Sequence, residues 1–103
     1  MDNFNQTEKS LITLSKTMSL FLGEEKTADL IALYTFYYYT SMWQKTKQIK
    51  VTTDYTAEKL KWTVNKVRKI KKELKRLNLI EDIIKRDRNN RIKGHFIGVK
   101  EAE

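Results

Sequence analysis

The fold is decided by residues 57–80, which read AEKLKWTVNKVRKIKKELKRLNLI. The stretch contains the end of a short helix that is predicted over residues 52–60. Thr63 is then expected to open a long helix that runs to about Leu77. At about 100° per residue, four aliphatic side chains of the long helix form one buried stripe: Val67, Ile70, Leu74 and Leu77. Asn78 follows where a C-cap is expected, because asparagine tolerates the left-handed conformation.

The opposite face of the long helix is polar and cationic. It carries one amide, four cations and no carboxylate: Asn65, Arg68, Lys69, Lys72 and Arg76. Glu73 lies at the flank of this face. A solvated lysine-rich surface is the ordinary explanation for such a face, and a surface that binds a polyanion is the other.

Further elements are predicted on both sides of this pair. Residues 24–46 predict a helix that is apolar almost all round and therefore needs neighbours on several sides. Residues 47–52 alternate and predict a short strand, and the short helix after them should have Thr53 or Asp54 near its N-cap. Downstream, LIEDIIKR and RIKGHFIGVK predict two strands joined by a polar turn of sequence DRNN.

This arrangement resembles winged-helix DNA-binding domains. The match lies in the spacing of Ala57, Leu60, Trp62, Thr63 and Val67, and in the hairpin residues Ile80, Ile83, Ile92 and Phe96, which resemble the wing. It covers about residues 24–100. The segments ALYTFYYYTSMWQKT, VTTDYTAEKL and NLIED with RIKGHFIGVK are similar to small phage or mobile-element members, which are often linked to phage replication or transcription control.

The resemblance implies a mainly α fold with a small β-hairpin (α+β), in which a three-helix core carries a two- to three-stranded wing sheet. We expect residues 1–23 to be an N-terminal extension that packs on the domain, residues 24–100 to be the winged-helix domain, and residues 101–103 to be a tail. Two residues depart from the family pattern: Lys61 replaces the usual glycine of the turn, and Thr56 replaces an aliphatic residue. A non-glycine residue with positive φ costs about 1 kcal/mol.

In such a domain the second helix enters the major groove of DNA. The expected contacts of this recognition helix are Thr63, Val64, Asn65, Lys66, Arg68, Lys69, Lys72 and Arg76. Asn65 suits the adenine edge, Arg68 suits guanine, and Val64 can touch a thymine methyl. The cations farther along the helix would meet phosphates.

The wing and the short helix before the recognition helix supply further residues that are expected to contact DNA. The wing residues expected to contact DNA are Arg86, Arg88, Asn89, Asn90, Arg91 and Lys93, and the expected phosphate contacts are Thr52, Thr53 and Tyr55. The alternatives are a solvated turn for the wing, and a helix cap and a core tyrosine for the second group.

Net charge and the near absence of histidine and cysteine favour some classes of function and exclude others. The 103 residues carry a net charge of +8, and residues 44–100 alone hold 18 basic against 6 acidic side chains. With one histidine and no cysteine, we expect no enzyme, no metal site, no cofactor and no small-molecule substrate. No apolar run is long enough for a membrane span and no signal peptide is recognisable. We therefore expect a cytoplasmic protein of a prokaryote or phage-infected cell, with double-stranded DNA as partner.

The aromatic first helix suggests a second surface. We expect a homodimer through Leu33, Phe36, Tyr37 and Trp43, and the competing account is that residues 11–22 fold back over the same surface. A stacking platform for single strands is disfavoured, because Tyr37, Tyr38 and Tyr39 point in three directions on a helix. The alternative function is a protein-interaction module that uses this helix on a winged-helix scaffold. RNA binding is a weaker alternative.

Overall fold

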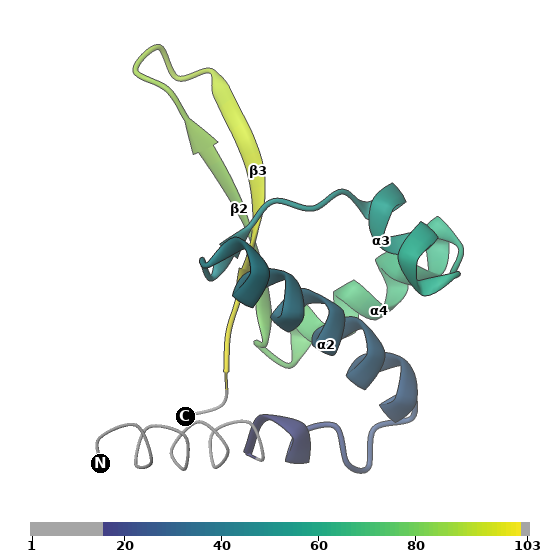
Figure 1. Cartoon of the computed structure of the whole chain (residues 1–103). Coiled ribbons are helices and arrows are strands. Elements are labelled where there is room, and N and C mark those ends of the chain that lie inside the picture. Colours follow the sequence, from purple (N-terminus) through teal and green to yellow (C-terminus); the bar gives the residue numbers. More distant parts are fainter. Residues whose placement is uncertain (1–15, 102–103) are drawn as a thin grey trace.

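The computed structural model describes residues 16–101 and has an α+β fold. After a helical turn at residues 16–19, the elements are α2 (Thr27–Gln44), β1 (Gln48–Ile49), α3 (Thr53–Leu60), α4 (Val64–Arg76), β2 (Ile80–Arg86) and β3 (Ile92–Val99). The three strands form one antiparallel sheet in the order β1-β3-β2. The hairpin β2–β3 projects away from the helices (Figure 1). The predicted α+β class is thus confirmed, although β1 has only two residues.

Threonine side chains begin both central helices. The Thr63 hydroxyl accepts a hydrogen bond from the Lys66 amide (3.1 Å) and caps α4, as expected. Helix α3 is capped by Thr52, whose hydroxyl accepts from the Tyr55 amide (3.0 Å), so Thr53 and Asp54 lie near the N-cap, as expected, directly after the capping residue. The cap must have an extended backbone, and Thr52 has one, with φ −83° and ψ 154°.

The turn between α3 and α4 is left-handed despite its lysine. Lys61 has φ 57°, the conformation that glycine adopts at little cost, and its amide is bonded to the last turn of α3. Thr56, the other departure from the family pattern, is fully buried, and its hydroxyl donates to the Thr52 carbonyl oxygen (2.8 Å). Both residues are therefore accommodated where α3 turns into α4.

The core forms where α4 meets α2 and the sheet. Val67, Ile70 and Leu74 of α4 are buried, and Leu77 is partly buried beside them. The residues of α2 that face this core recur at helical spacing: Leu30, Leu33, Tyr34, Tyr37 and Ser41. The strands contribute Ile49, Ile80, Ile97 and Val99.

Two of the four residues predicted to face a second subunit lie in this core. Leu33 is 0% and Tyr37 is 1% exposed, so this part of the dimer prediction was wrong. The reason is that α2 packs against α3, α4, β1 and β3 within one chain, which covers more of its circumference than one helix pair would. Phe36 is half-buried, and Trp43 is 76% exposed.

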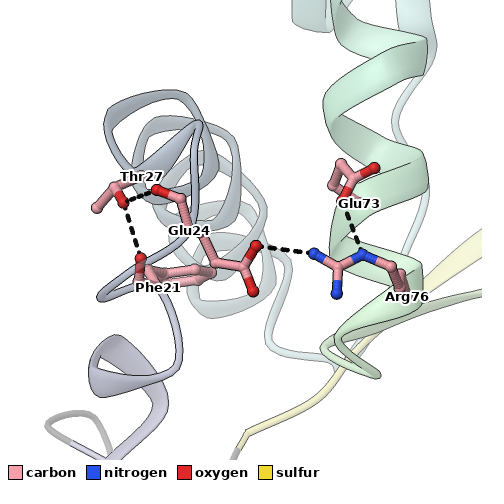
Figure 2. Close-up of polar contacts among 5 residues, drawn as sticks. All are labelled: Phe21, Glu24, Thr27, Glu73 and Arg76. Carbon is pink, nitrogen blue, oxygen red and sulfur yellow. Dashed lines mark hydrogen bonds and ion pairs between the residues drawn. The ribbon is translucent and has the colours of Figure 1, made fainter.

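The chain before α2 is attached to the core through Phe21. This ring is fully buried and lies 5.6 Å from the Tyr34 ring, centroid to centroid. The Thr27 hydroxyl donates to the Phe21 carbonyl oxygen (2.8 Å), which holds the approach to α2 (Figure 2). Residues 11–15, which belong to the segment expected to cover α2, lie outside the described residues.

The hairpin turn is organised by one carboxylate. Asp87 Oδ1 accepts from the amides of Asn89 (2.9 Å) and Arg91 (3.0 Å), and Asn90 adopts a positive φ of 63°. The strand register shifts between Lys85 and Arg86, which leaves an extra residue in β3 near the tip. The tip is therefore a defined structure that presents its cations outward.

We predict that Lys61→Gly increases the free energy of unfolding by about 1 kcal/mol, because glycine removes the cost of positive φ at this turn. The matched control is Lys72→Gly on the exposed face of α4. This change should lower the free energy of unfolding by about 1 kcal/mol, because glycine is unfavourable inside a helix. Urea unfolding measures both. A loss of stability in Lys61→Gly would contradict the left-handed turn.

Candidate nucleic-acid interface

One face of α4 is exposed and has no partner among the residues that the structure describes. Asn65, Arg68, Lys69 and Lys72 are exposed, and across residues 16–101 none of their side chains forms an ion pair or a hydrogen bond. The buried stripe on the opposite side fixes the rotation of the helix. This uncompensated polar face, which we call the free face, is therefore held toward solvent by the core.

Carboxylates of the α2 region and of α4 itself engage Lys66 and Arg76, two cations next to the free face. Lys66 Nζ lies 3.2 Å from Asp29 Oδ1 of α2 and 4.5 Å from the centroid of the Trp62 ring. Arg76 is held by Glu73 and Glu24, with 2.8 Å in each N–O pair (Figure 2). Hydrogen bonds to Glu73 and then Glu24 raise the pKa of the Arg76 guanidinium.

Asp82 of β2 engages two further cations of α4. Its carboxylate pairs with Lys71 (3.0 Å) and with Lys75. Burial alone would raise the pKa of Asp82, but the hydrogen bonds and charges of the two lysines hold it below its ordinary value. The strand that begins the hairpin is thereby attached to α4.

The residues predicted to contact DNA from the recognition helix fall into two groups, those with a partner or a structural role in the chain and those without. Lys66 and Arg76 are engaged inside the chain, Thr63 is the cap, and Val64 is half-buried against the core. The other four residues form the free face. Sequence reasoning missed the partners Glu24, Asp29 and Asp82, although Lys71 and Lys75 lie one turn apart on α4 and could have indicated a shared carboxylate.

The hairpin adds a second group of cations near its tip. Arg88, Arg91 and Lys93 are exposed and form no ion pair with any described residue, while Arg86 donates to the Asn90 carbonyl oxygen (3.1 Å). Asn89 and Asn90 are exposed in the turn itself. The only carboxylate of the tip, Asp87, is occupied by backbone amides.

The start of α3 contributes less than expected to an exposed polar surface. The Thr52 hydroxyl oxygen serves as the helix cap, and Thr53 is half-buried. Tyr55 is 49% exposed, so the alternative of a core tyrosine was wrong. Its ring lies 6.4 Å from that of Phe36, and Lys59 Nζ lies 5.4 Å above it.

In the part of the chain that the structure describes, no group of three or more acidic or histidine residues could hold a metal ion. None of the helices described here is both long and apolar enough to cross a membrane. No family model, curated protein or solved structure matches the chain.

We predict that Lys75→Met and Lys71→Met each raise the pKa of Asp82, because the desolvation that remains favours the protonated form. Lys72→Met, on the free face, is the matched control and should leave it unchanged. Carboxyl NMR titration measures this pKa. An unchanged value in the first two variants would contradict the ion pairs.

The same ion pairs make stability depend on pH. The pKa of Asp82 is lower in the folded state than in the unfolded state. The contribution of Asp82 to the free energy of unfolding is therefore complete above the ordinary aspartate pKa, and it is lost as pH falls through the folded-state pKa.

Proposed function

We propose that this protein binds double-stranded DNA in a sequence-specific manner as a winged-helix domain, with α4 as the recognition helix. The observation that carries the proposal is the free face: one amide and three cations, exposed and unpartnered, on a helix whose other side is buried. Carboxylates engage Lys66, Lys71 and Arg76, while the four residues of the free face stay available to a partner.

The composition of the free face suits the major groove. Asn65 lies in the first turn of α4, where side chains of a recognition helix reach base edges, and its amide can pair with adenine N6 and N7. Arg68, one turn later, can pair with guanine O6 and N7. Lys69 and Lys72 would contact neighbouring acceptors or phosphates.

The hairpin would contact the DNA beside the recognition helix. Its unpaired cations at residues 88–93 can follow the phosphate backbone or enter a narrow minor groove, which attracts arginine. Thr52, Thr53 and Tyr55 are retained only as peripheral phosphate contacts, since a capping hydroxyl can still donate its own hydrogen.

The resemblance to phage and mobile-element proteins supports a role in replication initiation or transcription control, in a prokaryotic or phage-infected cell. The alternative function, a protein-interaction module, is favoured by the exposed aromatic residues at the end of α2. A salt titration distinguishes the two, because phosphate contacts give a log–log slope of about −0.9 per contact on duplex DNA.

We predict that Asn65→Ala and Arg68→Ala each cost about 1–3 kcal/mol on the preferred duplex and much less on random duplex. Arg76→Ala is the matched control, because Glu24 and Glu73 already hold this arginine, and it should weaken binding less. Fluorescence anisotropy with labelled duplexes measures both affinities. Equal losses on preferred and random DNA would show that the free face does not read bases.

We predict that the double change Arg88→Ala and Arg91→Ala weakens binding similarly for all duplexes and makes the salt slope shallower by about two units. The control is Lys47→Ala, because this lysine pairs with Glu101 (3.0 Å) on another part of the surface. An unchanged slope in the double variant would mean that the hairpin tip stays in solvent.

A further inference from the structure

A groove of about 700 Å³ lies between the C-terminal half of α2, the segment at residues 50–52 and α3. Its lining includes four aromatic rings, those of Phe36, Tyr39, Trp43 and Tyr55. Of these, Trp43 is 76% and Tyr39 is 66% exposed. Exposed aromatic side chains gathered in one hollow are typical of a binding surface.

The groove is preformed by hydrogen bonds to the backbone. The Gln44 side chain at the end of α2 donates to the Lys50 carbonyl oxygen (3.0 Å) and accepts from the Lys50 amide (3.0 Å). This pair of bonds fixes the segment that leads into α3 against α2. The aromatic rings of α2 and the Tyr55 ring of α3 therefore line the same groove.

The charge that lines the groove has a single sign. Lys50 and Lys59 line it, and no carboxylate of residues 16–101 does. Neither lysine forms an ion pair with any residue from 16 to 101. Lys59 Nζ lies 5.4 Å from the Tyr55 ring centroid, so a cation stands directly beside an exposed ring face. The groove is thus complementary to a flexible polyanion that carries flat apolar groups.

We propose that this aromatic groove binds single-stranded nucleic acid, with bases stacked on Tyr39, Trp43 and Tyr55 and phosphates paired with Lys50 and Lys59. Rings combined with cations are the usual composition of such sites, because every base offers a face for stacking. Apart from the rings, the apolar lining is only Val51, which offers little to an aliphatic helix of a partner protein. A second copy with the same groove would bring like-charged lysines together.

The site is separate from the free face of α4. None of Asn65, Arg68, Lys69 or Lys72 lines the groove. The groove shares only Thr52 and Tyr55, peripheral phosphate contacts, with the proposed duplex site, and the proposal goes beyond duplex binding. It also replaces the second subunit predicted from sequence as the occupant of Phe36 and Trp43.

The test uses Trp43 as its own reporter. The chain has two tryptophans, so Trp62→Phe leaves Trp43 as the only indole. An oligothymidylate of about ten nucleotides, added at low salt, should quench the fluorescence of this variant as bases stack on Trp43. Anisotropy of the labelled oligonucleotide should give the same affinity for the wild-type protein.

Substitutions then assign the binding to the groove. Trp43→Ala and Tyr55→Ala should each weaken oligonucleotide binding about 5- to 150-fold, and Trp43→Phe should keep most of it. Met42→Ala changes an exposed neighbour that does not line the groove, and this matched control should leave the affinity unchanged. Lys50→Ala and Lys59→Ala should each make the salt slope shallower by about 0.7. Unfolding curves verify that every variant is folded.

Several results would overturn the proposal. They are an absence of quenching, affinity that Trp43→Ala leaves unchanged, or a wild-type dimer in sedimentation that Trp43→Ala dissociates, since a second chain would then occupy the groove. Arg68→Ala separates this test from that of duplex binding, because it should weaken binding to the preferred duplex and leave oligothymidylate binding intact.

Discussion

The packing of Val67, Ile70 and Leu74 against α2 is the constraint on which the other features of the structure depend. Three aliphatic side chains at helical spacing have one favourable orientation, toward the core, and burial of each contributes about 1.5–3 kcal/mol. That orientation sets the rotation of α4 about its axis. The rotation in turn decides which cations of the helix face outward and which lie beside α2 and β2.

Three carboxylates outside α4 form ion pairs with some of these cations. Asp29 engages Lys66, Glu24 engages Arg76, and Asp82 engages Lys71 and Lys75, while the cations of the free face form no ion pair with any described residue. Exposed ion pairs of this kind add little stability. Their larger effect is on the surface potential, which they concentrate on Arg68, Lys69 and Lys72.

Local patterns in the sequence were sufficient for the helices. The cap at Thr63, the stripe on α4, the left-handed Asn78 and the polar hairpin turn are all present, because each depends on residues a few positions apart. The surface of α2 was harder to predict. Leu33 and Tyr37 are buried because residues far along the chain pack around them, and periodicity does not reveal how many neighbours a helix has. The ion pairs of Glu24 and Asp82 and the aromatic groove were missed for the same reason.

We propose above all that the free face of α4 reads base sequence. Selection of bound duplexes from a random pool tests this claim most directly, when it is carried out with the wild-type protein and with Asn65→Ala. We expect the wild type to enrich a defined motif containing an adenine, and the variant to lose the preference at that position while keeping the rest. A wild-type pool without any enriched motif would contradict it.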